Sequence, residues 1–257
     1  MSAPATELPP PSLAAYTAEQ LAFARLAWPM RAAEELRSAL VFRALERAAH
    51  AVGGALWAGF GAAIARVVRD ELRHTRLCVA VGAALGAPPP AWDRSPLRAR
   101  LAALPSPRLR AGALLLVEAA IGETVSSLLF RAGRRAAVEP LTRAALTSIL
   151  GDEVRHARLG WAALAALWPA LDDAERAALQ REATAGLGGL ERTVALPALA
   201  RLDRGEPFDP AHAALGVLAP AARVEAFYEA VERLVLPRLD RLGLDGQAAW
   251  RERYRGQ

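Results

Sequence analysis

One pentapeptide pattern occurs twice in the chain, each time deep within a segment of helical periodicity. Residues 70–74 are Asp-Glu-Leu-Arg-His, and residues 152–156 are Asp-Glu-Val-Arg-His. On a helix, a glutamate and a histidine three residues apart project from the same face, about 60° apart around the axis. The repeat therefore predicts two helical hairpins built on one plan, each carrying an acid–imidazole pair.

The composition favours an all-helical protein. Hydrophobic residues make up 53% of the 257 residues, and most are alanine and leucine rather than β-branched or aromatic. This content excludes a chain that is disordered throughout. The basic residues are all arginines, but they are interspersed with 27 acids and give a formal net charge of only +5. Because they form no long basic run, we expect no nucleic-acid partner.

The sequence also indicates a compartment. Cys78 is the single cysteine, which excludes an intramolecular disulfide and fits a reducing environment. Residues 1–15 contain several prolines and no basic residue, unlike a signal peptide. No uncharged run reaches the roughly 20 apolar residues that a spanning helix needs. We therefore expect a cytoplasmic protein without a membrane segment.

Prolines and glycines divide the chain into helical segments. Residues 17–168 are expected to form a helical bundle that carries the site, with helices over residues 17–50, 55–85, 108–134 and 140–168. Pro29 is expected to kink or divide the first helix. The long loop before the third helix can cross from one end of the bundle to the other.

The two ends of the chain carry weaker patterns. Residues 1–16 are rich in proline and are expected to be disordered. Residues 169–257 are expected to form a C-terminal helical extension packed on the bundle, with helices over residues 172–199 and 221–242. A break in the first of these is predicted at residues 186–189, where glycines cluster.

The two Glu-x-x-His pairs can hold a dinuclear metal site if each remaining helix adds one carboxylate. The pairs are Glu71 with His74 and Glu153 with His156. The full set of four carboxylates and two imidazoles suits two divalent irons, since bridging carboxylates offset their charge. His74 and His156 each have acids at both the third and the fourth preceding position. His50 and His212 have an acid at only one of these positions, and we interpret them as ordinary surface or capping histidines.

Each remaining helix offers two candidate carboxylates. The first helix has Glu34 and Glu35, whose side chains diverge by about 100°, and the third has Glu118 and Glu123, about 140° apart. The apolar periodicity does not separate the members of either pair, so one of each is expected to point inward. Glu118 lies on so apolar a face that its burial is costly unless it is paired or metal-bound.

These residues resemble those of the ferritin-like diiron-carboxylate superfamily over about residues 20–168. Glu-Leu-Arg-Ser at 35–38, Gly-Glu-Thr-Val at 122–125 and Asp-Glu-Val-Arg-His-Ala at 152–157 are similar to bacterial ferritin-like domain proteins of unassigned activity. The resemblance implies an all-α fold, a ferritin-like four-helix bundle with additional C-terminal helices. It also implies the metal ligands Glu35, Glu71, His74, Glu123, Glu153 and His156.

The same resemblance implies that an aspartate orients each histidine ligand from outside the coordination shell. Asp70 is expected beside His156, and Asp152 beside His74. Arg73 and Arg155, by contrast, are expected to pair with acids on the bundle exterior.

A more distant similarity is to diiron N-oxygenases of aromatic amines. Those enzymes have a further histidine one turn before the fourth-helix glutamate, where this chain has Ile149. The resemblance therefore supports the six-ligand core rather than the arylamine reaction.

We interpret the chain as a non-haem diiron oxygenase or oxidase that activates O2 to oxidise a small organic substrate. Its expected cofactor is two iron ions, with manganese or a mixed iron–manganese pair as the alternative, and it needs an electron donor. The competing hypotheses are a ferritin-type ferroxidase or iron-handling protein, and a non-enzymatic helical scaffold with a vestigial site. The C-terminal helices are expected to roof a pocket, pack on the bundle or form a homodimer face.

Overall fold

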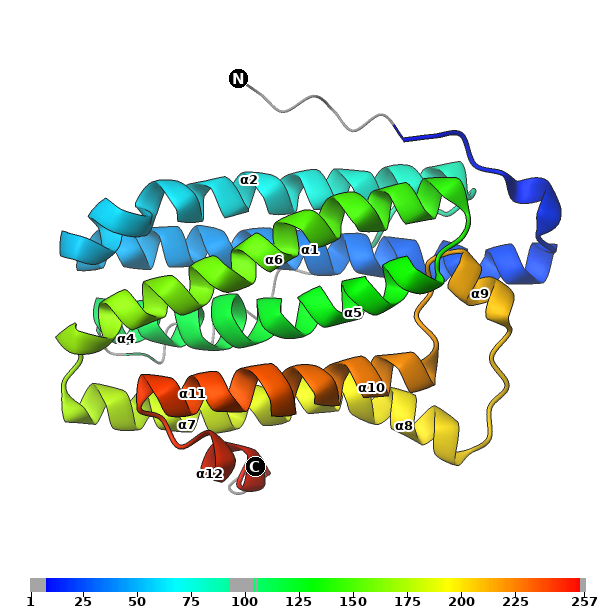
Figure 1. The fold of residues 1–257 in the computed structure, drawn as a ribbon. Coiled ribbons are helices and arrows are strands. Elements are labelled where there is room, and N and C mark those ends of the chain that lie inside the picture. Colours follow the sequence, from blue (N-terminus) through cyan, green and yellow to red (C-terminus); the bar gives the residue numbers. More distant parts are fainter. Residues whose placement is uncertain (1–7, 93–103, 105, 255–257) are drawn as a thin grey trace.

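The computed structural model describes residues 8–92, 104 and 106–254, and every regular element in these ranges is a helix. Four rods form the bundle (Figure 1): α1 (Ala18–Val52), α2 (Gly54–Ala84), a third composed of α4 (Pro107–Ala113), η2 (Leu114–Gly122) and α5 (Glu123–Ala136), and α6 (Pro140–Leu167). The end of α2 and the start of α4 lie at opposite ends of the bundle, so the third rod runs parallel to α2. The prediction of an all-α four-helix bundle with additional C-terminal helices is confirmed.

The first helix is longer and more continuous than predicted. Thr17 caps α1 by accepting a hydrogen bond from the backbone N–H of Gln20, whose side chain accepts in return from the Thr17 N–H. The helix then runs through Pro29 without a division. The proline ring packs against α2 at Gly82, where a Cβ atom would lie 3.7 Å from the proline Cδ, an ordinary contact distance. Packing along α2 outweighs the backbone hydrogen bond that the proline cannot donate.

The third rod is the core helix of the molecule. Its central part, η2, is π-helical, and nearly all of its side chains are buried. Pro107–Ala136 is the one described segment that is long and apolar enough to cross a membrane. However, 72% of its most apolar 18-residue stretch is buried inside the protein. It contacts α1, α6 and α7, so its apolar character is explained by its central position.

The C-terminal helices form a second layer against the third rod (Figure 1). After a short 3-10 turn η3 (Trp168–Ala170), one rod comprises α7 (Asp173–Leu190), π-helical η4 (Glu191–Ala195) and α8 (Leu196–Asp203). A short α9 (Pro210–Ala214) follows. The chain then returns through α10 (Pro220–Ala230), π-helical η5 (Val231–Val235), α11 (Leu236–Leu242) and α12 (Gly246–Arg251).

The predicted break at residues 186–189 is wrong, because α7 continues to Leu190. A Cβ atom at Gly186 would lie only 2.8 Å from Cγ1 of Val117 in η2. This glycine therefore allows α7 to approach the core helix closely instead of ending the helix.

A buried glutamate connects three parts of the C-terminal extension. Glu191 of η4 accepts a hydrogen bond from the Tyr228 hydroxyl over 2.7 Å and also contacts Arg253 and Tyr254. Burial acts to raise the pKa of Glu191, but these partners outweigh it and hold the pKa below its ordinary value. The residues after α12 thus contact the rod that covers the bundle.

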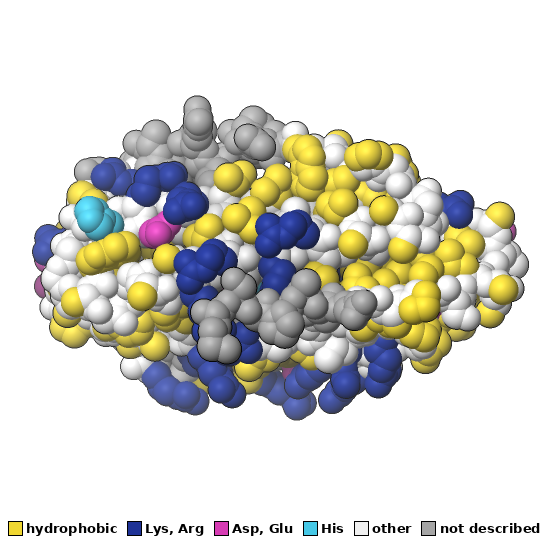
Figure 2. Space-filling view, turned by 90° about the horizontal axis from the view of Figure 1, so that it is seen from above, with side chains coloured by type: hydrophobic (Ala, Val, Ile, Leu, Met, Phe, Trp, Pro, Cys, Tyr) yellow, Lys and Arg dark blue, Asp and Glu magenta, His cyan; other side chains and the backbone are white. Residues whose placement is uncertain are grey.

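The prediction of disorder over residues 1–16 lies outside the described residues for 1–7. In the described part, η1 (Leu13–Ala15) forms a 3-10 turn, and the Ser12 backbone N–H donates to Glu139 over 3.1 Å. This stretch thus contacts the residue that caps α6. Figure 2 shows the side of the bundle away from the C-terminal helices, where arginine side chains are scattered among hydrophobic ones.

Candidate metal centre

The six side chains predicted as ligands come together in the interior of the bundle. Glu35 projects from α1, Glu123 from the start of α5, and the two Glu-x-x-His pairs from α2 and α6. Each of the six is at most 6% exposed. Four buried carboxylates in one place carry a large desolvation cost, so this arrangement requires a compensating positive charge.

The donor atoms fall into two groups, within each of which they lie no more than 4.8 Å apart. The two groups share Glu71 and Glu153, while each adds one glutamate and one histidine of its own: Glu35 with His74, and Glu123 with His156. Two cations held by these groups would therefore share two carboxylates. This is the pattern of a carboxylate-bridged dinuclear site.

Several donor atoms of the cluster are unsatisfied. Seven buried side-chain atoms of the described residues have no hydrogen-bond partner, and five of them belong to this cluster: Glu71 Oε1, His74 Nδ1, Glu123 Oε2, Glu153 Oε1 and His156 Nδ1. They nevertheless lie close to one another, with His74 Nδ1 3.3 Å from Glu153 Oε1 and 3.4 Å from Glu35 Oε2. Buried polar atoms are normally paired, and metal ions placed among these would satisfy all of them. The residues present therefore fit a dinuclear metal centre.

The two predicted orienting aspartates lie beside the histidines of the opposite helices. Asp152 Oδ2 is 3.1 Å from His74 Nε2, and Asp70 Oδ2 is 3.4 Å from His156 Nε2. These contacts engage Nε2 of each ring and leave Nδ1 facing the carboxylates. A histidine held in this way presents its Nδ1 lone pair to a metal.

The prediction for Arg73 and Arg155 is wrong. Both contact Asp152, which is 5% exposed and lies beside His74, rather than acids on the exterior. Arg73 reaches it from α2 and also donates to Ser148 over 2.8 Å. Asp152 thus has three partners, the guanidinium groups of Arg73 and Arg155 and the imidazole of His74. Arg73 and His74 reach it because α2 packs against α6.

The pKa values of the cluster residues reflect two effects: burial, which disfavours the charged form of each group, and the charges of the neighbouring groups. Burial, together with the Glu153 and Glu71 charges, raises the pKa of Glu35 to about 8, and that of Glu123 rises well above its ordinary value. Burial acts in the same direction on Glu71, but the two histidines outweigh it and lower that pKa to about 2. The carboxylates in turn raise the pKa of His74 to about 12 against the opposing effect of burial. The histidines thus carry positive charge that metal ions would replace.

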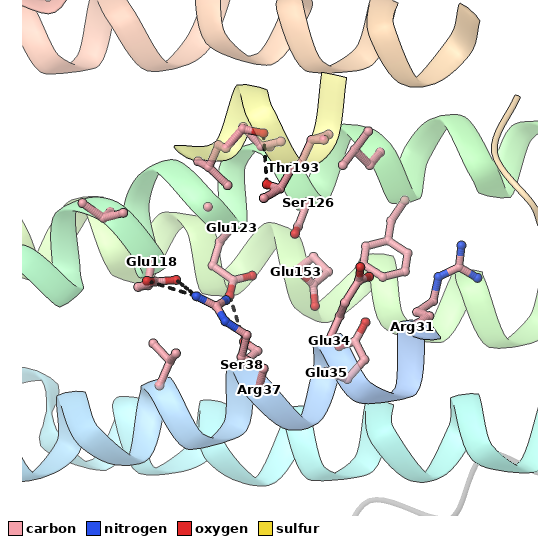
Figure 3. Close-up of a pocket in the computed structure, with 18 of the residues that line it drawn as sticks. Arg31, Glu34, Glu35, Arg37, Ser38, Glu118, Glu123, Ser126, Glu153 and Thr193 are labelled. Atoms are coloured by element: carbon pink, nitrogen blue, oxygen red, sulfur yellow. Dashed lines mark hydrogen bonds and ion pairs between the residues drawn. The ribbon is translucent and has the colours of Figure 1, made fainter. Parts of the chain in front are cut away.

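A cavity of about 540 Å³ adjoins the cluster (Figure 3). Its wall includes four cluster glutamates, namely Glu35, Glu71, Glu123 and Glu153. The opposite wall comes from the C-terminal extension, through residues 185–194 of α7 and η4 and through Arg223 of α10. The C-terminal extension thus contacts the third rod and contributes residues to the cavity wall.

The structure also separates the alternative glutamates. Glu35 and Glu123 belong to the donor groups, whereas Glu34 and Glu118 line the cavity outside them. Glu118 lies 3.5 Å from Arg37, an ion pair visible in Figure 3. Both Glu118 and Glu123 reach the cavity because η2 is π-helical. Hydrogen bonds from i to i+5 bring residues five apart toward one face, which α-helical spacing does not.

Sequence reasoning missed the charged residues of the cavity wall. Arg31 precedes Glu35 by four residues on α1, so helical periodicity could have placed it on the same face. Arg223 carries no such signal, because only the packing of α10 brings it to the cavity.

No protein-family model and no curated protein matches this chain. Its fold is similar to that of a solved structure from Synechococcus described as protein 19 with aldehyde deformylating oxidase activity. The TM-score is 0.59 and the sequence identity 18%, over 91% of this chain and 96% of the other. At this identity the likeness establishes the fold. The fold and the cluster define the class, a ferritin-like helical bundle with a buried carboxylate–histidine centre, and the resemblance inferred from the sequence is confirmed at that level.

Asp152→Asn is expected to weaken metal binding about 10- to 100-fold, because the amide loses the charge that orients His74. Competition of Fe(II) or Co(II) with a chromophoric chelator measures the affinity. Asp173→Asn, at a fully exposed position at the start of α7, is the matched control and should leave the affinity unchanged. Equal affinities of the two variants would contradict a role of Asp152 in holding His74.

Proposed function

We propose that this protein is a non-haem diiron oxidase or oxygenase that oxidises a small organic substrate. The observation that carries the proposal is that the four glutamates of the carboxylate–histidine cluster form part of the wall of a cavity. The cavity volume of about 540 Å³ lies within the roughly 300–1,000 Å³ typical of small-molecule sites. A molecule held there would be in contact with the glutamates that hold the metals.

The donor set suits iron. Glu35, Glu71, His74 and Glu153 would hold one ion, and Glu71, Glu123, Glu153 and His156 would hold the other. Carboxylate and imidazole donors also accept manganese, so an iron–manganese pair is the alternative. When bound, two ferrous ions can together supply electrons to O2, the chemistry that oxidation of an organic molecule requires.

The chain itself positions the imidazoles and provides an apolar surface for a substrate. Asp70 and Asp152 hold the two imidazoles with Nδ1 toward the carboxylates. Apolar side chains from η2, α5 and η4 form much of the cavity wall, among them Val117, Leu129 and Val194. Such side chains favour apolar parts of a substrate. The activity in the description of the similar Synechococcus structure supports an oxidoreductase function.

Consumption of O2 distinguishes this proposal from iron handling. With Fe(II) alone, the reconstituted protein is expected to consume O2 only until its bound iron is oxidised. Multiple turnovers should require both an organic substrate and a reductant. An oxygen electrode and a panel of medium-chain aldehydes, alcohols and carboxylates provide the measurement. A ferroxidase would instead turn over with added Fe(II) and no organic molecule, and a vestigial scaffold would show neither behaviour.

A further inference from the structure

One end of the cavity carries an arginine whose hydrogen-bonding capacity is only partly used. Arg31 of α1 lines the cavity, and its Nη2 donates to the carbonyl of Gly216 over 3.2 Å. Its guanidinium carbon lies 4.6 Å from the Trp28 ring centroid and 5.6 Å from that of Phe130. Its Nη1 is buried and has no hydrogen-bond partner among the described residues. The guanidinium is therefore held in place with one edge unpaired.

A second arginine lies near the first. Arg223 of α10 lines the same cavity and is coupled electrostatically to both Arg31 and Glu34. Burial lowers the pKa of Arg223, the Glu34 carboxylate opposes this, and the Arg31 charge adds to it. No ion pair shorter than 4.0 Å joins either arginine to an acid within the described part of the chain.

The charges on the cavity wall do not balance. Outside the donor groups, the described lining has three arginines and two glutamates: Arg31, Arg37, Arg223, Glu34 and Glu118. Arg37 is paired with Glu118. Glu34 is then the one remaining acid of this described lining, and neither Arg31 nor Arg223 forms an ion pair with it, so the two arginines carry more positive charge than Glu34 can offset. Buried charge without a partner is costly, and an anionic ligand would compensate it.

From this juxtaposition we propose that the cavity binds an organic carboxylate, with its anionic head at Arg31 and Arg223 and its apolar chain directed to the glutamate cluster. The inference rests on the proposed function and names the substrate class of that site. Arg31 and Glu35 are one helical turn apart on α1, about 6 Å along the axis. Apolar side chains of the cavity wall, among them Phe130, Leu146 and Leu218, are suited to a hydrocarbon chain. Arginine's planar fork matches a carboxylate in two parallel hydrogen bonds.

Ligands that differ only in the head group test the proposal on the full-length protein. Octanoate, 1-octanol and octylammonium share one apolar chain, and isothermal titration calorimetry gives their dissociation constants. Octanoate is expected to bind about tenfold to a hundredfold more tightly than octanol, because hydrogen bonds to charged groups are the stronger kind. Octylammonium should bind more weakly still. Equal binding of octanoate and octanol, or binding of none of the three, would overturn the proposal.

Variants locate the head group. Arg31→Gln and Arg223→Gln are each expected to remove most of the preference for octanoate, whereas Arg43→Gln, a half-exposed arginine of the same helix paired with Glu46, should retain it. Survival of the preference in both cavity variants would place the carboxylate elsewhere. The ligand series on the unmodified protein needs no variant, so the proposal stays falsifiable even if a variant does not fold.

The same titration before and after removal of metal with EDTA distinguishes this inference from the proposed function. A preference for octanoate that persists without metal supports the arginine site, even if the protein fails to consume O2. A preference that disappears with the metal assigns the carboxylate to the metal ions and overturns the inference, while leaving the diiron proposal intact.

Discussion

Replacing His74 and His156 together by alanine is expected to reduce bound iron from about two ions per chain to background. Each donor group contains one histidine, so the double variant removes a ligand from both groups. The four buried glutamates that stay behind then have no imidazole between them. Iron content after anaerobic reconstitution, measured by mass spectrometry of the desalted protein, provides the test.

The chain offers a matched control for this experiment. His50 and His212 are the other two histidines, and neither belongs to a donor group: the His50 ring packs against Trp57, and the His212 ring against Phe23 and Phe208. The double variant His50→Ala/His212→Ala should load iron like the unmodified protein. Circular dichroism of both double variants verifies that helical content is kept. Normal iron loading without His74 and His156 would refute the metal centre.

Gly160→Ala is expected to lower the free energy of unfolding by about 3 kcal/mol or more. A Cβ atom at Gly160 would lie 2.2 Å from the carbonyl oxygen of Ala119 and 2.7 Å from the backbone nitrogen of Ala120. These are backbone atoms of the π-helical core segment, so no change of rotamer relieves the clash. His156 lies on α6, and Glu123 directly follows η2. Moving these two helices apart should therefore also reduce iron loading.

Urea denaturation followed by circular dichroism measures this effect. Gly151→Ala on the same helix is the control, since nothing lies within 4 Å of its Cβ position. That variant should gain about 0.5–1 kcal/mol from the higher helix propensity of alanine. If Gly160→Ala is as stable as Gly151→Ala, the close approach of α6 to η2 is not a real constraint.

The parts of the site that could be predicted are those with local spacing. A Glu-x-x-His pair places both side chains on one helix face whatever surrounds the helix. The pairs Glu71/His74 and Glu153/His156 could therefore be recognised from the sequence, and the structure brings them into one cluster. Metal ligation by this cluster stays a prediction until iron is measured.

The choice of glutamates on the other two rods could not be made from α-helical spacing. Glu34 and Glu35 both face the cavity, and so do Glu118 and Glu123. The π-helical geometry of η2 changes the angle between the last two, and no periodicity in the sequence indicated it. Only the resemblance to known diiron proteins had favoured Glu35 and Glu123.

The amino-acid sequence by itself determined the four helical rods of the bundle and the inward pairing of acids with imidazoles. Both depend on residues three or four positions apart, whose relative directions a helix imposes. The tertiary structure alone decided the cavity, its charged end and the partners of Asp152. Those features join Arg31 to Gly216 and Arg223, and Arg73 to Asp152, across long separations in the chain. Contacts of that kind depend on how whole helices pack, which local patterns do not encode.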